Sequence, residues 1–112
     1  MKHVMHLDKK YFDLINENKK NIEIRLLDEK RKKLSINDTI IFVNKDNHDD
    51  TITVKVDSIN SYKSFKELFT HSNHEELLWL STSIDAMVDE MHNIYPPSSE
   101  EKYGVLKISF RK

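Results

Sequence analysis

The chain contains a single glycine, Gly104, among its 112 residues, and this scarcity limits the folds that it can adopt. Glycine-rich loops that surround phosphate groups need several glycines close together, so Walker-type and dinucleotide-binding motifs are excluded. Turns must instead be formed by Asn, Asp, Ser and Pro, which support turn conformations. Cysteine is absent as well, which excludes disulfides, thiolate zinc sites and cysteine nucleophiles. Any binding or catalytic function must therefore rest on other side chains.

Length and hydropathy predict one globular domain over residues 1–112. Charged residues make up 33% of the chain and the mean hydropathy is −0.66, values that are typical of a soluble protein. No segment approaches the roughly 18 consecutive apolar residues of a membrane span. The first six residues lack the apolar stretch of a signal peptide. We therefore expect a cytoplasmic protein with no membrane partner and no obligatory protein partner.

Basic residues are concentrated in one stretch of a chain whose net charge is −1. Residues 19–33 contain seven basic and three acidic residues, which gives this stretch a charge of +4. Such a patch suits a small anionic ligand or a short nucleic-acid contact. The alternative is a solvated surface of ordinary ion pairs, and charge alone favours this alternative.

Hydrophobic periodicity predicts strands that are interleaved with short helices. Residues 22–26 alternate apolar and polar side chains, as a half-buried strand does. Residues 84–95 carry apolar side chains at helical spacing until Pro96 and Pro97 end the helix. The other predicted strands are 3–7, 39–43, 51–58 and 104–110, the other predicted helices cover 9–17 and begin at 64 and 73, and 44–50 is a predicted polar loop. This pattern predicts an α+β fold built as a small open β-barrel.

Three charged residues at the second predicted strand form the strongest candidate site. Strand side chains alternate between two faces, so Glu23 and Arg25 project together, and Lys20 precedes the strand on the same side. Arg25 suits bidentate recognition of a phosphate or a base edge. Lys20 suits a phosphate contact, and Glu23 suits an exocyclic amine or holds Arg25 in place. The alternative is a solvated strand face whose ion pairs contribute little stability.

The pattern Lys20-x-x-Glu23-x-Arg25 resembles the GxKxxExR signature of the ASCH domain, a family of the PUA-like superfamily. Further segments look like blocks of small single-domain bacterial members, namely 5–7, 25–31, 37–42, 62–69 and 101–106. The resemblance covers nearly the whole chain. One departure is that Asn18 occupies the position of the signature glycine. Because asparagine tolerates a left-handed turn, we expect the fold to survive this change.

The resemblance implies a small PUA-like open β-barrel flanked by short helices, with RNA or a nucleotide bound in the cleft of the signature residues. Lys20, Glu23 and Arg25 are the implied binding residues. Lys30 and Arg31, from the same basic stretch, are further candidates for RNA binding, although surface ion pairs are the simpler explanation for them. No cofactor and no metal site is implied.

An enzymatic alternative also comes from this resemblance. Some small bacterial ASCH proteins look like amidohydrolases that remove the acetyl group from acetylated cytidine with a Lys, a nucleophilic Thr and a Glu. Lys20 matches the Lys, but Glu23 occupies the Thr position, and a carboxylate does not replace an activated hydroxyl in acyl transfer. The later Glu has no good match, since only Glu75 or Glu76 lies near its place. We therefore expect a binding module first, a hydrolase second and a protein-interaction domain third.

Histidines and aromatic residues give weaker signals. His71-x-x-His74 places two imidazoles one turn apart if the segment is helical, but without cysteine or an HExxH pattern it is weak support for a metal. Trp79, Tyr62 and Tyr95 are candidates to stack on a base. Their apolar neighbours favour packing in the core instead.

Overall fold

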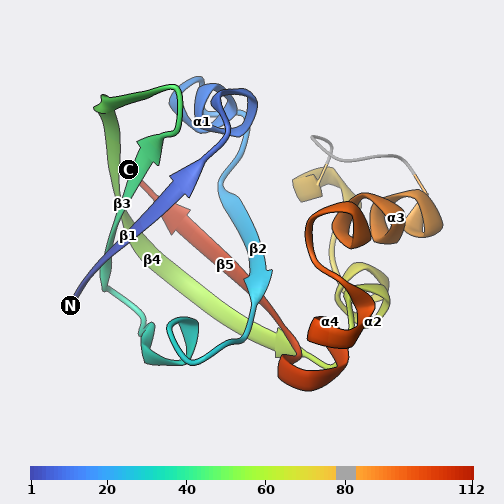
Figure 1. The fold of residues 1–112 in the computed structure, drawn as a ribbon. Coiled ribbons are helices and arrows are strands. Elements are labelled where there is room, and N and C mark those ends of the chain that lie inside the picture. The colour runs from blue at the N-terminus through green and yellow to red at the C-terminus, as the bar shows by residue number, and fades with distance from the viewer. Residues whose placement is uncertain (78–82) are drawn as a thin grey trace.

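The computed structural model describes residues 1–77 and 83–112 as a sheet flanked by short helices (Figure 1). The strands are β1 (Lys2–Leu7), β2 (Ile22–Leu26), β3 (Thr39–Asn44), β4 (Asn47–Tyr62) and β5 (Val105–Arg111). The α-helices are α1 (Lys9–Asn16), α2 (Phe65–Thr70), α3 (Ile84–Ile94) and α4 (Pro97–Tyr103), and the 3-10 helices are η1 (Arg31–Lys33) and η2 (His74–Leu77). The predicted α+β class is confirmed. None of the described helices is long and apolar enough to cross a membrane.

Within the described residues, five strands form one curled sheet in the order β1-β3-β4-β5-β2. β1 pairs in parallel with β3, whereas the other neighbouring strands are antiparallel. β4 pairs with β3 along its first part and with β5 along its second, and its register to β5 shifts between Val56 and Ser58. Such a bulge bends a strand and increases its twist. The sheet therefore curls into a half-barrel whose two edges are β1 and β2 (Figure 1).

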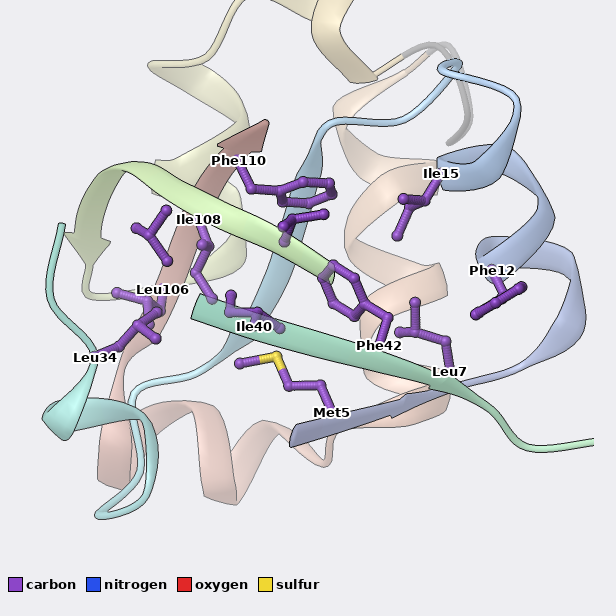
Figure 2. Close-up of a cluster of buried hydrophobic side chains, with 12 residues drawn as sticks. Met5, Leu7, Phe12, Ile15, Leu34, Ile40, Phe42, Leu106, Ile108 and Phe110 are labelled. Atoms are coloured by element: carbon purple, nitrogen blue, oxygen red, sulfur yellow. The ribbon is translucent and has the colours of Figure 1, made fainter. Parts of the chain in front are cut away.

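A hydrophobic core fills the concave side of the half-barrel (Figure 2). The rings of Phe42 on β3 and Phe110 on β5 pack against each other with their centroids 5.1 Å apart. α1 adds Phe12 and Ile15, both almost completely buried, which is the apolar face that its periodicity predicts. Since burying one such side chain contributes about 1.5–3 kcal/mol, this cluster fixes α1 against the sheet.

A second core lies between the opposite face of β2 and the helices α2 and α3. Ile22 and Ile24 of β2 pack there with side chains such as Met91 of α3. Because strand side chains alternate, Glu23 and Arg25 point away from this core. The predicted strand and its two faces are confirmed, and β2 has apolar residues on one face and charged residues on the other.

Asparagine replaces glycine at two turns, as the scarcity of glycine requires. Asn18, after α1, has a φ of 62°, and Asn37, before β3, has a φ of 72°. Both are in the left-handed region, which asparagine enters more readily than most residues. Gly104 has a φ of 75°, and an added Cβ there would lie 3.1 Å from the carbonyl oxygen of Tyr62. The one glycine is therefore at a place where a side chain would strain the backbone and crowd the Tyr62 carbonyl.

The predicted polar loop at 44–50 is wrong, because most of it belongs to a β-hairpin. β3 continues to Asn44 and β4 begins at Asn47, so only Lys45 and Asp46 form the turn. The outer hairpin residues are exposed. A strand pair that projects into solvent is held by its backbone ladder, so its sequence shows no apolar alternation.

The sequence also gave no sign of α4, although it correctly placed the end of α3. Pro96 and Pro97 end α3, and Pro97 then occupies the first turn of α4. Proline is favoured there because its missing N–H would have no partner within the helix. α4 buries no residue completely, which explains why it lacks apolar periodicity.

Candidate functional site

A pocket of about 80 Å³ lies where the edge strands β1 and β2 approach each other. The Nη2 of Arg25, on β2, donates a hydrogen bond to the carbonyl oxygen of His6, on β1, at 3.3 Å. α1 and α3 complete the walls. The lining residues are His6, Leu7, Asp8, Tyr11, Lys20, Glu23, Ile24, Arg25, Lys45, Met91, Ile94 and Tyr95. The three residues Lys20, Glu23 and Arg25, which the sequence singled out, thus lie in one cleft.

Lys20 and Glu23 form a buried ion pair at the base of this cleft. The Nζ of Lys20 lies 2.6 Å from Oε2 of Glu23 and also donates to the carbonyl oxygen of Ile22 at 2.7 Å. The Lys20 side chain is only 1% exposed, and that of Glu23 is 11% exposed. Burial lowers the pKa of Lys20, whereas the Glu23 carboxylate acts in the opposite direction and raises it. A buried ammonium is costly without a partner, so the Glu23 carboxylate offsets part of the cost of burying Lys20.

Arg25 extends the same network toward the opening of the pocket. Its Nε lies 3.4 Å from Oε1 of Glu23, so each carboxylate oxygen faces one cation. That Nε is buried and has no hydrogen-bond partner among the described residues. The Arg25 side chain is 15% exposed, more than that of Lys20. Of the two cations beside Glu23, Arg25 is therefore the one that a ligand can reach.

Tyr95 forms another part of the pocket wall and lies close to Arg25. It lies at the C-terminal end of α3, is half-buried and lines the pocket. Its ring also stacks on Phe65, with centroids 6.0 Å apart, so it belongs to the second core as well. Burial raises the pKa of the Tyr95 hydroxyl, against the opposing effect of Arg25 nearby. Both sequence-based interpretations of Tyr95, core packing and a place at the ligand site, are therefore compatible with its position.

Charged and imidazole side chains surround the mouth of the pocket. Lys45, in the β3–β4 turn, pairs with Asp8 at 3.3 Å, and both side chains are mostly exposed. The exposed ring of His6 meets the ring of His48 edge-on, with centroids 5.7 Å apart. The charged residues that line the pocket carry a formal charge of +1, in a chain whose net charge is −1. This arrangement favours an anionic ligand over a cationic one.

The structure does not bring Lys30 and Arg31 into the pocket wall. Lys30 is exposed, and Arg31 begins η1. Asp28 accepts hydrogen bonds from the backbone N–H of Arg31 at 3.0 Å and from its guanidinium at 3.2 Å. Arg31 remains close enough to Tyr95 to affect the pKa of its hydroxyl. Arg31 therefore lies beside the cleft, while Lys30 belongs to the solvated surface.

The weaker sequence signals lie elsewhere. The ring of His71 stacks on Tyr62 with centroids 6.3 Å apart, and Nε2 of His74 lies 3.1 Å from the carbonyl oxygen of Phe69. Among the described residues, no group of three His, Cys, Asp or Glu is arranged to hold a metal. Glu76 pairs with Lys107 at 3.2 Å, and neither Glu75 nor Glu76 lines the pocket. The prediction for Trp79 falls outside the described residues.

Sequence reasoning missed the residues that other elements bring to the pocket. Tyr11 comes from α1, while Met91 and Ile94 come from α3. Ile94 is 52% exposed, an unusual position for a large apolar side chain. This exposure points to the pocket only once the fold is known. In the sequence, Ile94 simply continues the apolar side of α3.

Comparisons with known proteins agree with the fold and with the signature. The crystal structure of hypothetical protein PH0355 is 38% identical, with a TM-score of 0.86, and the match covers 99% of this chain and 98% of that one. The solution NMR structure of protein PF0455 from Pyrococcus furiosus is 32% identical, with a TM-score of 0.72, and the match covers 99% of this chain and 96% of that one. None of the curated proteins matches the chain.

A family model matches nearly the whole length of the chain. The model for the ASCH domain matches residues 5–112, a range that includes the second half of β1, the whole of β2 and all three signature residues. The half-barrel with its flanking helices is consistent with the PUA-like superfamily. The chain belongs to the ASCH domain family, a family that is generally linked to RNA binding.

Proposed function

We propose that the chain is a binding module for RNA or a nucleotide, and that the cleft between β1 and β2 takes the base or a phosphate of one nucleotide. The observation that carries this proposal is the position of Arg25. Its guanidinium lies between the Glu23 carboxylate and the His6 carbonyl, at the pocket where the edge strands meet. A guanidinium fixed in this way presents a planar set of donors, which matches a phosphate or the edge of a base.

The shape of the pocket limits what it takes. Its volume of about 80 Å³ is several times the roughly 10–15 Å³ that one water molecule requires. That is room for part of a single planar ring or a phosphate, and a base pair is too large. Tyr11, Tyr95 and Met91 offer aromatic and apolar surface beside the charges, which suits the π-face of an unpaired base.

The three signature residues take different roles in this proposal. Arg25 contacts the ligand directly. Glu23 orients Arg25 through its Oε1, which faces the guanidinium. The same oxygen can accept a hydrogen bond from an exocyclic amine of the ligand. Lys20 is buried and already donates hydrogen bonds to Glu23 and to the Ile22 carbonyl. Its role is therefore to hold the Glu23 carboxylate in position and to add positive charge to the cleft. This revises the expectation that Lys20 itself contacts phosphate.

A thermal-shift screen with nucleosides, nucleotides and short RNAs tests the proposal, because a ligand that binds only the native state raises the melting temperature. The variant Arg25→Ala is expected to lose the shift, whereas Lys66→Ala, which removes an exposed charge on α2 away from the pocket, is expected to keep it. Equal shifts in the wild type and in Arg25→Ala would show that the ligand binds elsewhere. No shift with any ligand would turn attention to a protein partner.

Hydrolysis of a modified nucleoside such as acetylated cytidine is the second candidate, and one observation favours it. Burial lowers the pKa of Lys20, and such environments are common for catalytic lysines. Glu23, at the position of the expected nucleophilic Thr, speaks against it because its carboxylate is held by two cations. The test is turnover of acetylated cytidine, which Lys20→Ala must abolish. Absence of turnover at high protein concentration would eliminate this candidate.

A further inference from the structure

A second, larger pocket lies behind Lys20, at the turn between α1 and β2. Its volume is about 340 Å³, and its walls come from the end of α1, the turn after it and the end of β5. Four of its lining residues are basic: Lys19, Lys20, Arg111 and Lys112. None of the described residues that line it is acidic. We call this pocket the basic groove.

The basic groove is formed by residues that are far apart in the sequence. The basic stretch 19–33 is not one patch in the structure, because β2 separates its beginning from η1. Instead Lys19 and Lys20 are joined by Arg111 and Lys112 from the opposite end of the chain. The backbone N–H of Phe110 donates to the carbonyl oxygen of Asn21 at 3.0 Å, which holds the end of β5 beside this turn.

Lys20 connects the two pockets, because it lines both the cleft and the basic groove. The two pockets are therefore neighbours around one buried side chain. We propose that the basic groove binds backbone phosphates of single-stranded nucleic acid, next to the nucleotide held in the cleft. This inference rests on the proposed function and makes it more specific, because it predicts an oligonucleotide rather than a free nucleotide as the preferred ligand.

The cations of the basic groove have partners that a phosphate can replace. Lys19 pairs with Glu17 at 3.4 Å, and both side chains are more than half exposed. Arg111 pairs with Asp57 at a similarly exposed position. Exposed ion pairs of this kind contribute only about 0–1 kcal/mol. Exchange of one carboxylate for a phosphate group therefore costs little, and the release of counterions from the nucleic acid favours it.

The test compares each of the four ribonucleoside monophosphates with the corresponding hexanucleotide, at several salt concentrations. In the double variant Lys19→Gln/Arg111→Gln, we expect mononucleotide affinity to stay within about twofold of the wild type. Hexanucleotide affinity should fall about fivefold or more, and the slope of log affinity against log salt should become shallower by about 1.4, since each phosphate contact of a single strand contributes about 0.7.

Asp57→Asn and Glu17→Gln are the matched controls. Each removes one of the two ion pairs that the test variant removes, but it leaves the cation in place and makes the surroundings of the groove more positive. We expect them to keep or strengthen hexanucleotide binding. If they weaken it as much as the double variant does, the effect comes from lost ion pairs and the inference is wrong.

The remaining outcomes separate this inference from the proposed function. One outcome is unchanged hexanucleotide affinity and salt slope in the double variant, together with loss of binding in Arg25→Ala. It would refute phosphate binding by the basic groove but support ligand binding in the cleft. If the wild type binds neither the mononucleotides nor the hexanucleotides, both proposals fail together. The melting temperature of each variant shows whether it is folded. Because the side chains of Lys19 and Arg111 are largely exposed, we expect the melting temperature of the double variant to change little.

Discussion

The guanidinium of Arg25 donates a hydrogen bond to the backbone carbonyl of His6, and it thereby connects the two edge strands of the sheet through one side chain. The acceptor is a backbone atom, so the contact does not depend on which side chain occupies position 6. Arg25→Lys keeps the charge but loses the planar set of donors. We expect it to weaken nucleotide binding about as strongly as Arg25→Ala, measured by titration calorimetry with the ligand of the screen. Full binding by Arg25→Lys would mean that charge alone is sufficient.

Removing Glu23 should destabilise the protein by leaving Lys20 buried without its anion. Breaking a buried pair of this kind costs about 3–5 kcal/mol. We expect Glu23→Gln to lower the free energy of unfolding by about 3 kcal/mol, measured by urea denaturation near neutral pH. The double variant Lys20→Met/Glu23→Gln is the control, because it removes the unpaired charge. It should recover most of the loss, and a double variant as unstable as Glu23→Gln would refute this explanation.

The same variant should have a distinctive pH dependence. The pKa of Lys20 is lowered from its ordinary value of 10.5, so the unfolded chain binds more protons than the folded one between the folded pKa and 10.5. Stability therefore rises with pH in this window. Glu23→Gln removes the carboxylate that raises the pKa, so the window extends to lower pH. Its deficit relative to the wild type should shrink as the pH rises toward 10.5, and a constant deficit would contradict a buried charged Lys20.

Acid should weaken the contact between Asp38 and the N-terminal strand. A hydrogen bond from His3 to the carboxylate, at 2.9 Å, is the main cause that lowers the pKa of Asp38 from 3.8 to about 2. A carboxylate with a lowered pKa stabilises the fold above its unfolded value and loses this contribution as the pH falls from 3.8 to about 2. Asp38→Asn should be less stable than the wild type at pH 5 but similar to it at pH 2. NMR titration of the carboxylate measures the pKa directly, and an unshifted value would reject this assignment.

Tyr95 should contribute to binding through its ring. Stacking of a base on an aromatic side chain is worth about 1–3 kcal/mol by alanine substitution. Tyr95→Ala should therefore weaken nucleotide binding about tenfold or more, whereas Tyr95→Phe should stay close to the wild type in calorimetric titration. Since Tyr95 also packs on Phe65, binding must be measured at a temperature at which both variants are folded. Unchanged binding by Tyr95→Ala would return Tyr95 to a purely structural role.

The left-handed turn at Asn18 allows a direct test of the signature position. Asn18 has a φ of 62°, so Asn18→Gly should be within about 1 kcal/mol of the wild type. Asn18→Ala should lower the free energy of unfolding by about 1 kcal/mol, since alanine is strained in this conformation. Asn37→Ala, at a φ of 72°, is the parallel case and should behave in the same way. Denaturation curves that rank alanine above glycine at position 18 would argue against the left-handed conformation.

The sequence was sufficient for the elements that have a strong apolar pattern. Alternation in β2 placed Glu23 and Arg25 on one face, and the spacing of Met87 and Met91 identified α3. It was insufficient for α4, whose residues are polar, and for the outer hairpin of β4, where no apolar alternation exists. Both elements are held by backbone hydrogen bonds or by neighbours, and neither has an apolar pattern of its own.

The candidate site also has a part that the sequence predicts and a part that it does not. Local spacing identified Lys20, Glu23 and Arg25, because they lie within six residues of one another. The partners of Arg25 depend on how far the sheet curls, and this follows from the register of several strand pairs. The acceptor on His6 is 19 residues away in the sequence, and Tyr95 comes from a helix on the other side of β2. No pattern within one segment contains this information.

The bulge in β4 has a consequence for the distance between the edge strands. β4 is the central strand, so its bend between Val56 and Ser58 determines how closely β1 and β2 approach on the opposite side of the half-barrel. The inserted residue is Asp57, whose side chain pairs with Arg111. Asp57 does not line the cleft, so a change in this bend would alter the spacing of the edge strands from outside the cleft. Insertions or deletions near Asp57 offer evolution a means to adapt the site to smaller or larger ligands while Lys20, Glu23 and Arg25 remain unchanged.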